Sequence, residues 1–215
     1  MRENGKRAPG RRSAEESRAT RERLLVEAEK QFARHGYVGT SVRDLASALG
    51  IAGSSVLHHV GSKRKLYAAV LQRISDSVGA VLKHIDDGEP SGIVRRLAER
   101  LMIWSELHPD YVQILLREMM ENPVRLNEAH RLQLADFLKE ALALTAKAVR
   151  TRSRKRVDPD MLLMLVIGAV SYFQIALPTF VAVRGGETRV LKRRFIDTLD
   201  ELIRSSLEAL PDTGE

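Results

Sequence analysis

One run of 23 residues without a charge constrains the fold of this chain more than any other feature. It covers residues 161–183, reads MLLMLVIGAVSYFQIALPTFVAV, and is the only run of its kind in the sequence. Its length would let it span a bilayer, but it would serve equally as a helix buried in a bundle or between subunits. Because it contains Gln174 and Pro178, we expect the buried helix and no membrane span.

The remaining sequence is typical of helices. Only 14 glycines and 7 prolines occur in 215 residues, too few for a β-rich protein, and no segment has a convincing strand pattern. Apolar residues recur at helical spacing between clear turn signals. The sequence therefore predicts an all-α fold, with helices at about residues 20–35, 42–49, 53–60, 62–85, 91–107, 110–121, 127–150, 158–183 and 189–209.

The net charge of +7 is concentrated near the start of the chain. Residues 1–66 hold 14 basic and 7 acidic residues, and the remainder holds 21 of each. This asymmetry favours a polyanionic partner, most plausibly nucleic acid, although a basic solvated tail would give the same count.

Several kinds of site are disfavoured by the sequence. The chain has no cysteine, which excludes disulfides and thiolate chemistry. Adjacent histidines such as His58 and His59 point about 100° apart on a helix and suit a shared metal poorly. We expect no catalytic residues, no metal and no cofactor. The first residues lack the apolar core of a secretory signal, so we expect a cytoplasmic protein associated with the bacterial nucleoid.

Residues 42–60 meet the demands of a helix-turn-helix, in which two helices cross at a tight turn. Leu45 and Leu49 would face inward from the first helix, and Gly50 can adopt the positive φ of the turn. Ile51 and Val56 would then pack the second helix against the first. Each signal is weak alone, but all of them fall inside the net-basic region.

The second of these helices would lie in the major groove of DNA. Its exposed serines can hydrogen bond to several bases, and leucine can contact a thymine methyl group. Arg43 could reach a guanine or a phosphate, and Lys63 at the next helix start could bind a phosphate. The side chains available to the groove are Ser54, Ser55, Leu57 and His58.

The stretch TRERLLVEAEKQFARHGYVGTSVRDLASALGIAGSSVLHHVGSKRKLYAAVL resembles the amino-terminal domain of the tetracycline-repressor (TetR) family. The likeness is carried by FARHGY, TSVRDLASALGI and HHVGSKRKL, in order and with the usual spacing. Two positions depart from the family pattern: Gly53 replaces a basic or polar residue, and Leu57 replaces an aromatic one. The resemblance implies that DNA is contacted by Thr40, Ser41, Arg43, Ser54, Ser55, Leu57, His58, His59 and Lys63.

The resemblance also implies a second, all-helical domain that binds a small molecule and forms a homodimer. We expect a disordered basic tail at residues 1–17, a three-helix DNA-binding domain at 18–62 and a six-helix sensing and dimerisation bundle at 63–211. The dimer would suit a palindromic operator in double-stranded DNA. Its interface is expected to include Leu165, Tyr172, Phe195, Leu199 and Leu202.

An effector pocket is expected among the helices between about residues 91 and 175. Such pockets combine aromatic surface with isolated polar groups. Gln174 is the clearest indication, because a buried amide needs partners. The aromatic residues could instead be plain core, and Arg117 could be a surface charge. The candidates are Trp104, Tyr111, Arg117, His130, Phe137, Tyr172, Phe173 and Gln174.

The predicted function is a transcriptional regulator, a repressor that a small-molecule effector releases from its operator. Three alternatives stay open: an enzyme in a helical bundle, a membrane-tethered adaptor using residues 161–183, and a nonspecific nucleoid-binding protein. No catalytic motif supports the first, and the polar residues of the run oppose the second.

Overall fold

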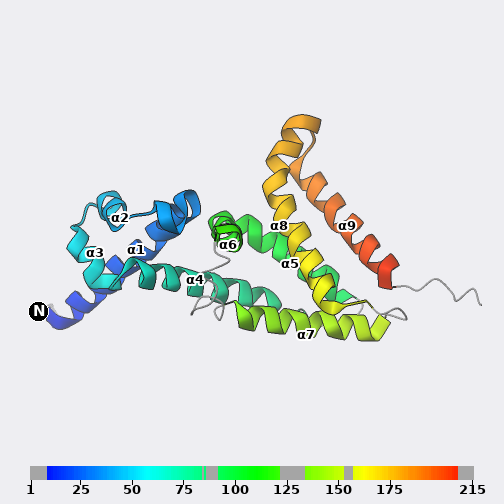
Figure 1. The fold of residues 1–215 in the computed structure, drawn as a ribbon, viewed down its shortest axis with the longest axis horizontal. Coiled ribbons are helices and arrows are strands. Elements are labelled where there is room, and N and C mark those ends of the chain that lie inside the picture. Colours follow the sequence, from blue (N-terminus) through cyan, green and yellow to red (C-terminus); the bar gives the residue numbers. More distant parts are fainter. Residues whose placement is uncertain (1–8, 84, 86–91, 122–133, 153–156, 208–215) are drawn as a thin grey trace, which may run out of the picture. The chain divides into compact units, whose positions relative to one another are not determined.

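The chain folds into helices, which confirms the all-α class (Figure 1). The computed structural model describes residues 9–83, 85, 92–121, 134–152 and 157–207. Two compact units are present. The amino-terminal unit consists of residues 1–74 and 110–130, and the carboxy-terminal unit of residues 75–109 and 131–215.

Helix α4 begins in the first unit and ends in the second. The amino-terminal unit contains α1 (Pro9–Gly39), α2 (Val42–Leu49), α3 (Gly53–Val60), the first part of α4 (Lys63–Gly79) and nearly all of α6 (Pro109–Glu121). The carboxy-terminal unit contains the end of α4, the 3-10 turn η1 (Ala80–Leu82), α5 (Ile93–Leu107), α7 (Ala135–Arg152), α8 (Pro159–Arg184) and α9 (Thr188–Leu207).

Local sequence signals set the boundaries of α1, α2 and α3. Gly36 has φ 70° and bends α1 near its end. Ser41 and Asp44 form a capping box: the Ser41 hydroxyl accepts from the Asp44 N–H, and the Asp44 carboxylate accepts from the Ser41 N–H, each at 3.1 Å. Gly50 ends α2 in the left-handed region at φ 65°, which a residue with a Cβ rarely adopts.

The core between α1, α2 and α3 is small and apolar. Leu24, Ala46 and Val56 are buried at its centre, one from each helix. Four partly buried residues pack around them, two of which, Leu49 and Ile51, were expected to do so: Val42, Leu49, Ile51 and Val60. This packing holds α2 and α3 in the arrangement that the pattern predicted.

The structure corrects two expected boundaries. Helix α1 begins at Pro9, so residues 9–17 are helical, whereas a disordered tail was expected there. The first part of α4 and α6 belong to the amino-terminal unit, whereas a boundary at residues 62–63 was expected. Contacts between residues far apart in the sequence cause the second difference, and a linear pattern does not reveal them.

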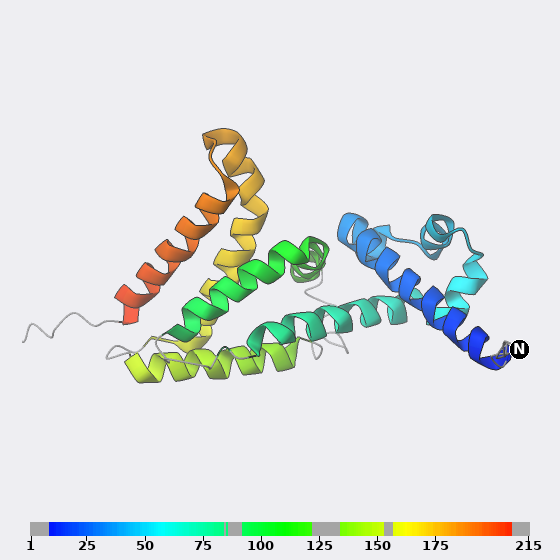
Figure 2. The same ribbon diagram turned by 180° about the vertical axis from the view of Figure 1, so that it is seen from behind.

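In the carboxy-terminal unit, α5 packs against α7, α8 and α9. Figures 1 and 2 both show α8 and α9 as a helical hairpin. Helix α8 buries one face. Because successive residues of an α-helix are rotated by about 100°, the buried positions can be placed around the axis, and they share an arc of about 100°. They are Leu162, Leu163, Val166, Val170 and Leu177.

The opposite face of α8 is apolar and exposed, within an arc of about 160°. Its exposed large residues, with those of α9, define the α8–α9 apolar surface: Met161, Met164, Leu165, Tyr172, Ile175, Phe180, Val183, Val190 and Leu202. By length and composition α8 could cross a membrane, and 28% of its most apolar stretch is buried within the chain. We expected α8 to be buried on nearly all sides, and within one chain it is not.

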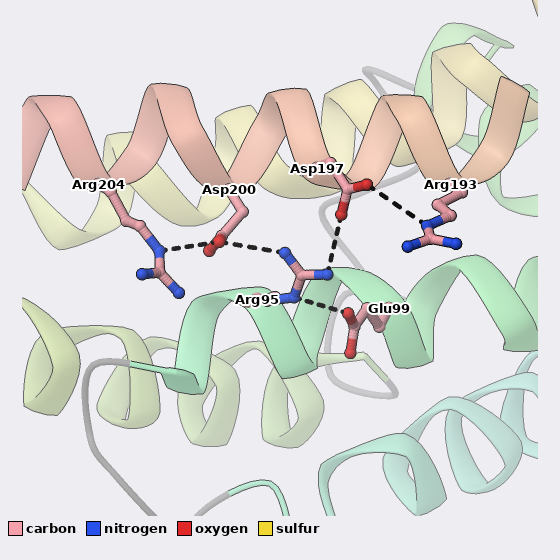
Figure 3. Close-up of polar contacts among 6 residues, drawn as sticks. All are labelled: Arg95, Glu99, Arg193, Asp197, Asp200 and Arg204. Atoms are coloured by element: carbon pink, nitrogen blue, oxygen red, sulfur yellow. Dashed lines mark hydrogen bonds and ion pairs between the residues drawn. The ribbon is translucent and has the colours of Figure 1, made fainter.

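A network of charges joins α5 to α9 (Figure 3). The Arg95 guanidinium contacts Asp197 and Asp200, each at 3.1 Å, and Glu99 at 2.8 Å. Arg204 contacts the same oxygen of Asp200, Oδ2, at 2.8 Å. The hydrogen bond that Arg95 donates to Asp197 is the main reason that the pKa of Arg95 is raised. Arg95 thus fixes α9 on α5 by charge.

Removing this charge is expected to loosen α9. Arg95→Ala should lower the free energy of unfolding by about 1–2 kcal/mol, because three partly exposed ion pairs are lost together. Urea denaturation measures the change, which should shrink in high salt. Arg193→Ala is the control, since Arg193 is exposed and lies 3.8 Å from Asp197. Equal effects from the two variants would contradict the role of Arg95.

Candidate nucleic-acid interface

α3 presents a largely polar surface along most of its length. Ser54 and His58 are exposed, Leu57 is 44% exposed, and Ser55 is half-buried. Val56 points the other way and is fully buried. Arg43 is exposed on α2, which packs against α3. Five residues expected to face DNA therefore lie on two adjoining helices with side chains at least partly accessible.

Two expected contacts have other partners. Thr40 is 1% exposed, and its hydroxyl donates to the Gly36 carbonyl at 2.9 Å, so its side chain does not reach the surface. We therefore remove the Thr40 side chain from the residues expected to touch DNA. Ser41 is exposed, but its hydroxyl binds Asp44. These hydrogen bonds are the main reason that the pKa of Asp44 is lowered.

The capping role of Ser41 gives a measurable expectation. Ser41→Ala should lower the free energy of unfolding by about 1 kcal/mol, as loss of a serine N-cap typically does. Ser47→Ala on the same helix is the control, because Ser47 is exposed within α2 and alanine favours a helix interior. Thermal denaturation compares the two, and equal stabilities would show that the cap contributes nothing.

The two histidines of α3 differ in their surroundings. His59 is half-buried, and its Nδ1 lies 3.5 Å from the Ser17 hydroxyl of α1. His58 is exposed, with its ring centroid 5.5 Å from that of His59. Within the described parts of the chain, no group of three metal-binding side chains comes together.

Lys63 is the first residue of α4, next to the interface. The Ser62 hydroxyl accepts from the Lys65 N–H at 3.1 Å and caps this helix. The Lys63 ammonium lies 4.4 Å from the centroid of the Tyr37 ring. Sequence reasoning missed Tyr37, since no periodic signal links it to a lysine 26 positions away.

Polar contacts attach α4 and α6 to α1. Glu29 is buried, lies 3.0 Å from Arg73, and accepts from the Tyr111 hydroxyl at 3.1 Å. Burial raises the pKa of Glu29, and Arg73 opposes that rise. Arg117 donates to the carbonyl oxygens of Ala33 and Arg34, each at 3.0 Å. Tyr111 and Arg117, both expected in the effector pocket, therefore bind α1 in the amino-terminal unit.

Most other pocket candidates lie in the carboxy-terminal unit. Trp104 is buried and donates to the Ser77 hydroxyl at 2.9 Å, and Phe137 is buried. Phe173 stacks on Phe195, one of the expected interface residues, with centroids 4.3 Å apart. Tyr172 is exposed on α8, and His130 lies outside the described residues.

Gln174 has its amide partners within the chain. Its Nε2 donates to the Ser105 hydroxyl at 2.7 Å and to the Met102 carbonyl at 3.2 Å. The requirement for a partner is thus met by α5. Among the expected interface residues, Leu165 and Leu202 are exposed, and Phe195 and Leu199 are half-buried.

Comparisons with known proteins agree with this architecture. Residues 24–70 match the family model described as bacterial regulatory proteins, tetR family. The transcriptional regulator RutR of Escherichia coli is 25% identical over 172 residues, covering 80% of this chain and 81% of RutR. The transcriptional repressor NicS of Pseudomonas putida is 23% identical over 166 residues, covering 74% and 77%.

A solved structure shares the fold. AibR in complex with isovaleryl coenzyme A and operator DNA superposes with a TM-score of 0.67 at 17% identity, covering 85% of this chain and 96% of AibR. At that identity the likeness shows the fold alone. Residues 24–70 therefore carry the likeness to the tetR family of bacterial regulatory proteins, and most of the chain is similar to transcriptional regulators.

Proposed function

We propose that this protein is a dimeric repressor that binds a palindromic operator and is released from it by a small-molecule effector. The observation that carries the proposal is the exposed face of α3, held beside Arg43 and Lys63 on a rigid helix-turn-helix core. α4 then runs directly from this unit into the second one.

The α3 face suits the major groove. Its exposed serine, leucine and histidine side chains can contact base edges, and Arg43 can bind guanine or phosphate. Gly53 offers no side chain at the start of α3. Base recognition would therefore depend mainly on Arg43, Leu57 and His58.

The α8–α9 apolar surface supports the homodimer. An exposed apolar area of this extent marks an interaction surface on a protein in water. A two-fold axis through it would pair each residue with the same surface on the other subunit. Two α3 helices could then lie roughly 34 Å apart, one in each half-site.

The effector would act through α4. A ligand bound among α5, α7 and α8 could shift the part of α4 that belongs to the carboxy-terminal unit, and this movement would change the separation of the two α3 helices. AibR, which shares this fold, was solved with both isovaleryl coenzyme A and operator DNA, and this supports the proposal. The protein would act in the cytoplasm, on chromosomal DNA.

A mobility-shift assay on DNA upstream of the protein's own gene tests the proposal. We expect a salt-sensitive shift that excess random DNA does not abolish. Complete competition by random DNA would favour a nonspecific nucleoid-binding protein. Failure to shift any fragment of the surrounding genome in a selection experiment would refute operator binding.

Arg43 should contribute strongly to this binding. Arg43→Ala is expected to weaken operator affinity about tenfold or more, because a good arginine–base contact is worth about 1–3 kcal/mol. Lys139→Ala on α7 is the matched control, since it also removes one exposed positive charge. Fluorescence anisotropy measures both affinities. Equal losses would remove Arg43 from the interface.

A further inference from the structure

The Tyr37 ring is held within an aromatic cluster at the end of α1. Gly36 bends the helix immediately before it. The Tyr37 ring stacks with Phe32 at 6.3 Å between centroids and tilts against Tyr67 at 4.9 Å. Phe32 and Tyr67 meet edge to face at 4.8 Å. Because both neighbours are buried, the position of the Tyr37 ring is fixed from two sides.

α6 supports this cluster through a hydrogen bond. The Tyr67 hydroxyl donates to Glu118, and both residues are buried. A buried tyrosine hydroxyl paired with a carboxylate fixes the plane of its ring. The ring against which Tyr37 rests is therefore anchored at its far end.

The Lys63 ammonium lies over the Tyr37 ring. Its distance of 4.4 Å from the Tyr37 centroid is well inside the range of a cation–π interaction. An ammonium has three donors, so contact with a ring leaves it able to donate to a phosphate oxygen as well. The ring is uncharged and attracts the ammonium much less strongly than a phosphate does.

We propose that Tyr37 is a positioning residue that holds the Lys63 ammonium in place for a DNA backbone phosphate. The inference rests on the proposed DNA binding and adds the residue that prepares this contact. A free lysine side chain would have to give up about 2 kcal/mol of rotamer freedom on binding. The ring restricts the side chain beforehand, so that less freedom is lost when the phosphate arrives.

The test is a double-mutant cycle on a fixed DNA duplex of random sequence, read by anisotropy over a range of salt concentrations. Lys63→Ala should make the slope of log affinity against log salt less negative by about 0.9, the value for one phosphate contact. Tyr37→Leu should weaken binding about two- to fivefold, and Tyr37→Phe, which keeps the ring, should bind like the wild type.

The decisive measurement is Tyr37→Leu in the Lys63→Ala background. If Tyr37 acts through Lys63, Tyr37→Leu should not weaken DNA binding further in the Lys63→Ala background. If Tyr37 only maintains the fold, it should weaken the Lys63→Ala protein as much as the wild type, which would overturn the inference. An unchanged salt slope in Lys63→Ala would also overturn it. A wild-type protein that binds no duplex even at low salt would instead refute the proposed function.

Discussion

Leu165→Glu is expected to convert the proposed dimer into a monomer. Leu165 is 68% exposed on the α8–α9 apolar surface. Burying a leucine against a partner contributes about 1.5–3 kcal/mol, and the two-fold axis makes this contact occur twice. A glutamate there would place two unpaired charges in an apolar interface, at a cost of several kcal/mol.

The same variant should bind its operator about a hundredfold more weakly, or worse. Two linked DNA-binding domains bind an operator far more tightly than one domain does, and a monomer loses that gain in affinity. Light scattering after gel filtration in buffer without detergent measures the number of chains, and anisotropy measures the affinity. The control is Leu138→Glu on α7, the same change at a leucine that is 45% exposed outside this surface.

Two outcomes would contradict this expectation. A Leu165→Glu protein that stays dimeric would place the interface elsewhere. A wild-type chain that stays with the membrane fraction, while Leu165→Glu enters the soluble fraction, would show that the surface faces lipid. α8 is long and apolar enough for that alternative, so the fractionation distinguishes the two environments.

The helix-turn-helix was predictable because its signals are local. The capping pair Ser41 and Asp44, three residues apart, and the left-handed Gly50 fix α2 without reference to the rest of the chain. The α3 pattern of exposed and buried residues follows from the packing of Val56 and Val60. The first helix was expected to end at about residue 35, and the bend occurs at the next residue, Gly36.

The candidate pocket was much less predictable, because it depends on which distant helices meet. In the sequence, Tyr111 and Arg117 look like polar residues that line a pocket. In the structure both hydrogen bond to α1, to partners more than 80 positions earlier in the chain. Gln174 was identified correctly as an amide that needs partners, and only the fold could show that α5 supplies them. Tyr37 was missed for the same reason, since its lysine lies on another helix.

Arg73→Met should lower the free energy of unfolding by about 3 kcal/mol at pH 7, because it leaves the buried Glu29 carboxylate without its cation. Arg73 bridges Glu29 and Glu22, and Glu29 is only 8% exposed. Methionine fills a similar volume, so the loss would come from charge and not from a cavity. Urea denaturation followed by circular dichroism measures the change, and Arg23→Met on the exposed side of α1 is the control.

The loss of unfolding free energy in Arg73→Met, its stability deficit, should depend on pH in a definite direction. Burial already raises the pKa of Glu29, and loss of Arg73 should raise it further. Folded Glu29 then takes up a proton at a higher pH than the unfolded chain, so stability is regained as the pH falls through the raised value. We expect a smaller deficit at pH 5 than at pH 7.

Adding Glu29→Gln should restore part of the loss at pH 7 and remove the pH dependence. A deficit that is equal at both pH values would show that packing, and not the buried charge, makes Arg73 important.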